Sequence, residues 1–154
     1  MDTDYPVIRF RRTTPDAIVP SYAHDGDAGM DLCATRDVTL RPGESAMVGS
    51  GIAIQLPRGF AGFVHARSGL GSKGLVIKHS TGVIDSGYRD EIKLVLFNNN
   101  PITSDRVFHV KKGDRVAQLV IQHVACATMV EVDSLEETER GTGGFGSSGI
   151  RPRI

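Results

Sequence analysis

The chain has 154 residues, of which 40% are hydrophobic and 6% aromatic, and it contains no tryptophan. This length fits a single domain, whose core should consist mainly of Val, Ile and Leu side chains. The 18 Lys and Arg residues balance the 18 Asp and Glu residues, which argues against a polyanion such as duplex nucleic acid as the partner but leaves room for one small triphosphate.

Targeting and cysteine patterns suggest where the protein works. No apolar run approaches the length of a membrane span, and the first residues, MDTDYPVIRFRR, carry acids and no apolar signal segment. Cys33 and Cys126 are the only cysteines, and neither belongs to a C-x-x-C pair or a histidine cluster. We therefore expect a cytoplasmic protein with two free thiols and without zinc or redox chemistry.

Short apolar runs separated by turn residues predict strands along most of the chain. In residues 51–56 and 91–97 the apolar side chains recur at every second position, which is the period of a strand. Glycine and proline end such runs, as in Arg-Pro-Gly at 41–43. The expected strands cover residues 38–40, 47–48, 51–56, 60–64, 91–97 and 115–122. This pattern predicts an all-β sandwich, jelly roll or barrel.

Two further organisational features follow from the sequence. Only residues 68–73 and 134–137 tolerate a helix, the latter because they have the spacing of a capping box. Residues 94–97 and 119–121 are apolar on both faces, which predicts burial between sheets or at a subunit interface. We expect a domain over residues 1–137 and a glycine-rich arm over residues 138–154.

Residues 24–32 contain acids in a polar, glycine-bearing segment. Asp27 and Asp31 are four positions apart, but the glycines make a turn more plausible than a helical face. Carboxylates in such a turn suit a hard cation or its bound waters. A turn that is capped and solvated by its own acids fits the same pattern.

Residues 65–70 end an apolar run with an arginine, a hydroxyl and a glycine. Arg67 can form paired hydrogen bonds to phosphate oxygens, while Ser68 and the Gly69 N–H can reach a bridging oxygen. A surface ion pair of Arg67 explains the pattern equally well. Further along, Gln118 lies within an apolar strand, where it either pairs with a neighbouring backbone or points into a polar site.

Residues 82–89 place Asp85 directly after two β-branched residues. An acid at the end of an apolar strand is held rigidly and partly desolvated, as a general base requires. Tyr88 can lie flat under a sugar ring. An Asp that opens the Asp-Ser-Gly turn by bonding its own backbone is the alternative. The five histidines are scattered without ligand spacing, and no Ser/His/Asp order suggests covalent catalysis.

The segment 140–149 is rich in glycine and serine and contains one isolated aromatic, Phe145. Glycines let backbone N–H groups converge on an anion, and Arg140 and the serines add donors for phosphate oxygens. Its G-x-G-x-x-G spacing lacks the strand, helix and acidic residue of a dinucleotide site. The segment therefore predicts a flap that closes over a nucleotide, with a disordered tail as the alternative.

In this order, the segments resemble the five motifs of the homotrimeric deoxyuridine triphosphatases (dUTPases). The motifs correspond to residues 28–32, 67–70, 82–89, 113–119 and 140–149. The resemblance implies a homotrimer of distorted jelly-roll or β-clip barrels of many short strands, with one short helix and a C-terminal arm that closes over a neighbouring subunit's site. It also implies hydrolysis of dUTP to dUMP and pyrophosphate, which keeps uracil out of DNA and supplies dUMP for thymidylate synthesis.

The resemblance also implies a role for each motif. Asp85 would activate the water that attacks the α-phosphorus, and Ser68 and Gln118 would complete the catalytic group. Tyr88 would pack on the deoxyribose and exclude a ribose hydroxyl. Mg²⁺ would sit on the triphosphate, with Asp31 in its outer shell through water. The remaining substrate contacts would come from Arg67, Ser68, Gly69 and Gln118 at the phosphates, from His79, Gly82, Val83, Ile84 and Lys93 near the nucleoside, and from Arg140, Phe145, Gly146, Ser147 and Ser148 of the arm.

The chain departs from the family's usual pattern at a few positions. Ala66 stands where proline often precedes the motif arginine, Asp90 stands where glycine usually follows Tyr-Arg, and residues 78–81 lack a common asparagine. A deoxycytidine triphosphate deaminase of the same fold and a non-catalytic nucleotide sensor are the rival functions. Tyr88, Asp85 and the complete tail favour hydrolysis over both.

Overall fold

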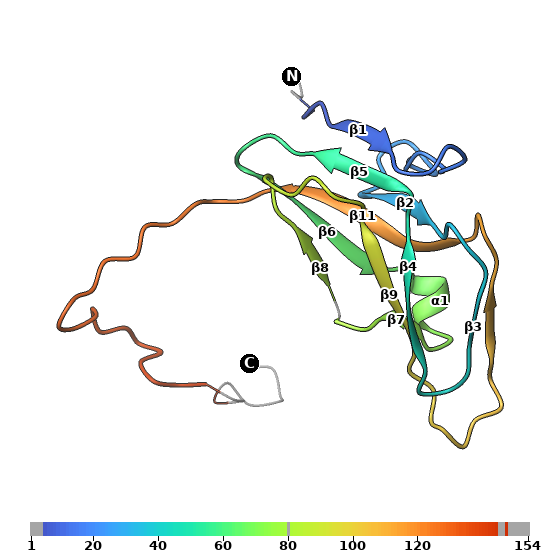
Figure 1. Ribbon diagram of the computed structural model, residues 1–154. Helices are drawn as coiled ribbons and strands as arrows, with labels where there is room; N and C mark the ends of the chain where they lie inside the picture. The colour runs from blue at the N-terminus through green and yellow to red at the C-terminus, as the bar shows by residue number, and fades with distance from the viewer. Residues whose placement is uncertain (1–4, 80, 145–146, 148–154) are drawn as a thin grey trace.

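The computed structural model describes residues 5–79, 81–144 and 147, and they form a nearly all-β molecule with one short helix (Figure 1). The all-β expectation is therefore confirmed. In chain order the elements are β1 (Arg9–Arg12), β2 (Gly29–Cys33), β3 (Val38–Leu40), β4 (Ser45–Gly49), β5 (Ile52–Gln55), β6 (Phe60–Ala66), α1 (Ser68–Gly71), β7 (Leu75–Ile77), β8 (Gly82–Ile84), β9 (Lys93–Asn98), β10 (Phe108–Val110) and β11 (Arg115–His123).

The strands form separate antiparallel sheets and do not close into one barrel. The largest sheet has the order β2-β11-β6-β8, and a second has the order β4-β9-β7. The pairs β1-β5 and β3-β10 complete the arrangement. The strand order makes β8 the edge of its sheet, paired with β6 on one side. The distorted jelly-roll or β-clip barrel that the resemblance implies is thus not closed in this single chain.

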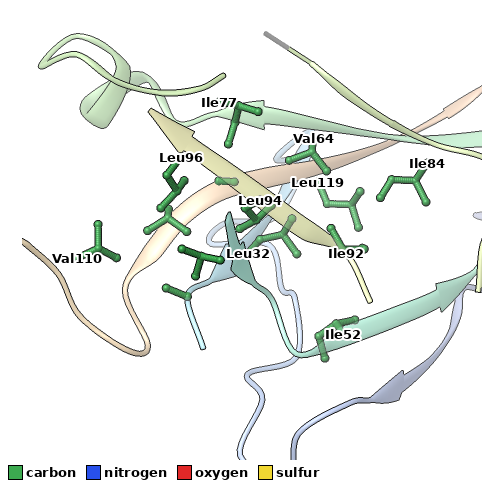
Figure 2. Close-up of a cluster of buried hydrophobic side chains, with 14 of the residues drawn as sticks. Leu32, Ile52, Val64, Ile77, Ile84, Ile92, Leu94, Leu96, Val110 and Leu119 are labelled. Atoms are coloured by element: carbon green, nitrogen blue, oxygen red, sulfur yellow. The ribbon is translucent and has the colours of Figure 1, made fainter. Parts of the chain in front are cut away.

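The core lies between the sheets and consists mainly of aliphatic side chains, as the composition predicts (Figure 2). In β9 buried residues alternate with exposed or half-buried ones, so that Leu94 and Leu96 point inward. The outward side chains Val95 and Phe97 stay half-buried. Residues that pack in this core include Leu32, Ile52, Val64, Ile77, Ile84, Ile92, Leu94, Leu96, Val110 and Leu119.

The region after β11 differs from the sequence prediction. Residues 134–137 are exposed and form no helix, although their spacing matches a capping box. A capping box offers only local hydrogen bonds, and here no apolar face packs against the body, as Leu135 is 87% exposed. Figure 1 shows the chain leaving the sheets after β11 and running as an extended arm. The exposed, extended part of the chain therefore begins before residue 137. The boundary between domain and arm at that residue stays a prediction.

The thiols and the helix content complete the description. Cys33 is buried and Cys126 is exposed, and both are free, as expected. No helix within the described ranges is long and apolar enough to cross a membrane.

Candidate active site

A polar cavity of about 500 Å³ lies where β2, β11 and the end of β6 meet. Arg67 follows the last residue of β6, and Ser68 and Gly69 open α1. Within the described chain, the N–H groups of Ser68 and Gly69 have no backbone partner, as is usual in the first turn of a helix. The lining residues include Asp27, Asp31, Arg67, Ser68, Gly69, Lys73 and Gln118. The cavity thus gathers cations, a hydroxyl and N–H donors that suit phosphate oxygens.

Asp31 links the two arginines of this region. Its Oδ1 lies 2.9 Å from Nε of Arg67, and its Oδ2 accepts a hydrogen bond from Nη1 of Arg115 at 3.0 Å. The Asp31 side chain is only 15% exposed. Asp31 lies inside strand β2, opposite Gln118, and not in the turn that the sequence suggested. The glycines misled that prediction, because Gly29 starts the strand and makes room for a neighbour.

That neighbour is Gln118, which occupies the space beside Gly29. A Cβ atom at position 29 would lie 2.8 Å from Oε1 of Gln118. The Gln118 Nε2 donates to the carbonyl of Ala66 at 3.0 Å, across the β11-β6 ladder. Both alternatives raised for Gln118 therefore hold at once, since it bonds a neighbouring backbone and also lines the polar cavity.

A second, smaller cavity of about 180 Å³ lies beside the edge strand β8. Asp85 directly follows β8, as predicted, and it is the one acid among the described residues that line this cavity. Its lining residues include His79, Gly82, Val83, Ile84, Asp85, Tyr88, Ile92 and Lys93. Because β8 ends its sheet, the backbone groups on its free side have no strand partner and can bind the edge of a planar base.

Asp85 is exposed, which corrects the expectation that it is partly desolvated. It lies beyond the end of an edge strand, where no other part of the described chain covers it. Among the described residues, its carboxylate receives no hydrogen bond and no ion pair, while Tyr88 N–H bonds to its backbone carbonyl at 3.0 Å. The Asp85 carboxylate is thus available to a water molecule.

Lys93 forms an ion pair at the rim of the same cavity. Its Nζ lies 3.0 Å from Oδ2 of Asp90, and both side chains are largely exposed. The Glu91 backbone N–H and then the Lys93 ammonium lower the pKa of Asp90, and the hydrogen bond that Lys93 donates to Asp90 raises the pKa of Lys93. Both groups therefore stay charged over the physiological pH range. The Tyr88 hydroxyl donates to the carbonyl of Glu91 at 3.0 Å.

The arm contributes little to either cavity in this single chain. Arg140 is exposed and its Nε donates to the carbonyl of Gly143 at 2.9 Å. Ser147 N–H bonds to the carbonyl of Gly144 at 3.0 Å. Phe145, Gly146 and Ser148, which the sequence also assigns to the site, lie outside the described residues.

The described acidic and histidine side chains near the two cavities do not gather into a metal site. In residues 5–79, 81–144 and 147, no group of three or more His, Cys, Asp or Glu side chains is placed to hold an ion. Each Asp31 oxygen is already paired with a guanidinium, Oδ1 with that of Arg67 and Oδ2 with that of Arg115.

The structure thus brings the predicted site residues together in two groups. The phosphate-type residues share one cavity and the nucleoside-type residues share another, and the described residues that line them do not overlap. Sequence reasoning assigned no site role to Lys73, Asp90, Glu91 or Arg115. Arg115 pairs with Asp31, 84 positions earlier, and no local pattern in the sequence indicates that pair. Asp90 pairs locally, with Lys93 three positions further on.

Comparison with known proteins gives consistent matches over most of the chain. A model of the dUTPase family matches residues 15–149. The deoxyuridine 5'-triphosphate nucleotidohydrolase of Rhodococcus erythropolis is 51% identical over 148 residues, covering 96% of this chain and 88% of its own. The protein of the same name from Thermobifida fusca is 52% identical over 143 residues, covering 92% of this chain and 78% of its own.

Solved structures agree with these sequence relatives. The dUTPase of Staphylococcus bacteriophage 80alpha with dUPNHPP superposes with a TM-score of 0.85 at 30% identity, covering 94% of this chain and 99% of that chain. A mutant dUTPase from phage phi11 of S. aureus, described as coordinating a structural Mg(II) ion, gives a TM-score of 0.77 at 28% identity, over 85% of this chain and 99% of that chain.

Proposed function

This chain belongs to the dUTPase family, and from that membership we propose that it hydrolyses dUTP to dUMP and pyrophosphate as a dUTP diphosphatase, with water attacking the α-phosphorus. Asp85 supports this proposal most directly. It is the one acid among the described residues lining the nucleoside cavity, and no described side chain occupies its carboxylate. Such an acid can accept a proton from a water held in line with the scissile bond.

The nucleoside is recognised in the smaller cavity. The free edge of β8, from Gly82 to Ile84, offers backbone N–H and C=O groups to the edge of uracil, with His79 beside it. A cavity of about 180 Å³ favours the smaller base, because thymine adds a methyl group. Tyr88 packs on the deoxyribose, and Lys93 lies near the substrate at the rim.

The phosphates bind in the larger cavity. Arg67, Ser68, Gly69 and Gln118 donate hydrogen bonds to phosphate oxygens, and Ser68 supports the leaving group. Hydrolysis of this kind requires charge compensation more than covalent chemistry, and guanidinium and N–H donors supply it. Mg²⁺ bound on the triphosphate would supply further charge compensation, and Asp31 would hold waters around it. The arm residues Arg140, Phe145, Gly146, Ser147 and Ser148 then cover the bound nucleotide and exclude water.

A homotrimer with shared sites is part of the same proposal. The two groups of site residues line separate cavities in one chain. A second copy can therefore place its phosphate cavity beside the nucleoside cavity of the first and complete the site. The outward face of β9 supports contact between copies, because Val95 and Phe97 lie beside Met47, which is 58% exposed. A cytoplasmic location also belongs here and rests on the two free thiols.

Pyrophosphate release tests this function. The protein with Mg²⁺ is given dUTP, dCTP, dTTP and UTP in parallel, and release from dUTP alone is the expected result. Binding of dUTP without release would contradict hydrolysis, and ammonia from dCTP would indicate the deaminase reaction instead.

A further inference from the structure

The Glu91 side chain joins the segment that carries Tyr88 to the residue before β5. Its Oε1 accepts the N–H of Gly51 at 2.6 Å, which ties residue 91 to the start of β5. Glu91 is half-buried and Gly51 is buried, so water competes little for this bond. Hydrogen bonds to an ionised acceptor are roughly twice as strong as neutral ones. The Glu91 side chain is therefore an anchor between the loop and the body of the protein.

Gly49 provides the space for this anchor. A Cβ atom at position 49 would overlap Oε1 of Glu91 and would lie 2.9 Å from its Cδ and 3.1 Å from Oγ1 of Thr35. The carboxylate thus sits in a slot that any side chain at position 49 would fill. Because the clash falls on the far end of a flexible side chain, a Cβ there would move Glu91 and leave the backbone of β4 in place.

The carbonyl group of Glu91 connects this anchor to Tyr88 at the cavity rim. It accepts the Tyr88 hydroxyl at 3.0 Å. Tyr88 is therefore tied directly to residue 91. The neighbouring Asp90 holds the Lys93 ammonium at 3.0 Å, at the same rim.

We propose that Glu91 is a positioning residue that fixes Tyr88 against the cavity, and that it thereby sets the preference for deoxyribose over ribose. The inference rests on the proposed function, in which Tyr88 excludes a ribose hydroxyl. A tyrosine ring excludes one oxygen atom only if its own position is fixed to well under the size of that atom. The Glu91 side chain has three rotatable bonds, and its carboxylate lies in the slot beside Gly49. This contact makes the segment that carries Tyr88 rigid.

Kinetics with dUTP and UTP test the proposal. In Glu91→Ala, KM for dUTP should rise about tenfold with kcat within about threefold, because uniform binding is lost. The dUTP-over-UTP ratio of kcat/KM should also fall about tenfold. Glu91→Gln keeps an acceptor oxygen, so its KM and its dUTP-over-UTP ratio should lie between those of wild type and Glu91→Ala. Gly49→Ala leaves Glu91 present but displaced, so it should show the same changes in KM and in the dUTP-over-UTP ratio as Glu91→Ala.

Glu44→Ala is the matched control. Glu44 also accepts a backbone N–H, that of Arg41 at 2.8 Å, but it lines neither cavity. This variant should leave both KM and the dUTP-over-UTP ratio unchanged. Wild-type ratios in Glu91→Ala and Gly49→Ala, in active protein, would overturn the proposal.

Hydrogen exchange separates this proposal from the proposed function. The Gly51 amide and the amides of residues 88–93 should exchange faster in Glu91→Ala than in wild type, whatever reaction the protein catalyses. If the wild-type protein does not hydrolyse dUTP, the proposed function is wrong. The exchange rates still show whether Glu91 holds residues 88–93 in place. Unchanged exchange would show that Glu91 positions nothing. Gly49→Ala and Glu91→Gln provide the same comparison if Glu91→Ala does not fold.

Discussion

Nε of Arg67 lies 2.9 Å from Oδ1 of Asp31, so the arginine that ends β6 is held by a carboxylate of strand β2. The second oxygen of that carboxylate is bonded to Arg115 at 3.0 Å. One acid thus orients two guanidinium groups, and the three side chains together keep a net positive charge. Such a cluster can bind a polyanion without first reorganising, because the arginines are already held near the cavity.

Removing the Asp31 charge should therefore impair phosphate binding. In Asp31→Asn, we expect kcat/KM for dUTP to fall about 10- to 100-fold, the usual range for an outer-shell partner, with a higher Mg²⁺ requirement. Asp37→Asn is the control, because Asp37 forms a similar ion pair with Lys111 at 2.9 Å but is exposed and lines neither cavity. Equal kcat/KM values for the two variants would remove Asp31 from the site.

Asp85→Asn should abolish turnover and preserve binding. Loss of a general base lowers kcat by about 10²- to 10⁴-fold, while the isosteric amide leaves the cavity shape intact. Turnover by pyrophosphate release and binding of dUTP by calorimetry check the two parts. Near-normal kcat would mean that another group accepts the proton.

Deleting residues 140–154 should impair hydrolysis without unfolding the body. In the described part of the arm, Arg140 is exposed and its Nε bonds only to Gly143. The thermal transition should therefore match that of the full chain, while kcat/KM should fall by about 100-fold or more because water is no longer excluded from the bound nucleotide. Unchanged kinetics would make the arm dispensable.

Mixing two inactive variants tests whether copies share a site. Asp85→Asn disables the nucleoside cavity and Arg67→Ala disables the phosphate cavity. If each site combines the two cavities from different copies, a refolded equal mixture should recover activity, at about a quarter of sites for random assembly. Sedimentation of wild type should give three times the chain mass. No recovery in a mixed trimer would place both halves of the site in one chain.

The two thiols should differ in reactivity. Burial raises the pKa of the Cys33 thiol, and the Asp31 carboxylate acts in the same direction. In the native protein at neutral pH, a thiol reagent should therefore label Cys126 rapidly and Cys33 only on unfolding. Equal labelling rates in the native state would contradict this burial.

The same shift predicts a loss of stability at alkaline pH. The folded protein binds the Cys33 proton more tightly than the unfolded chain, so this stabilisation is complete below the unfolded pKa of about 8.5 and is lost as pH rises through the folded pKa. Cys33→Ala should flatten the alkaline decline in unfolding free energy, and Cys126→Ala should not. Parallel declines in both variants would contradict the prediction.

The sequence indicated the strand ends that carry the proposed site residues better than the surroundings of those residues. The apolar run before Asp85 correctly indicated a strand end, and the run before Arg67 correctly indicated another. Asp31 was expected in a turn, because its neighbouring glycines do not reveal that Gly29 makes space for Gln118 across the sheet. Contacts between distant segments leave no local periodicity, so they had to come from the structure.

Residues that act through the backbone were also beyond sequence reasoning. Glu91 looked like a polar residue at the start of a strand, whereas its carboxylate bonds Gly51, 40 positions earlier. The helix that the sequence allows at 134–137 does not form, for the opposite reason: the local capping spacing is present without any packing partner.

Isotope labelling tests the central claim, that water attacks the α-phosphorus, which is the reaction that the role of Asp85 requires. Hydrolysis of dUTP is run for a single turnover in H₂¹⁸O, and dUMP and pyrophosphate are separated and analysed by mass spectrometry. The account predicts ¹⁸O in the phosphate of dUMP and none in pyrophosphate. Label in pyrophosphate would mean attack at the β-phosphorus and would contradict the role proposed for Asp85.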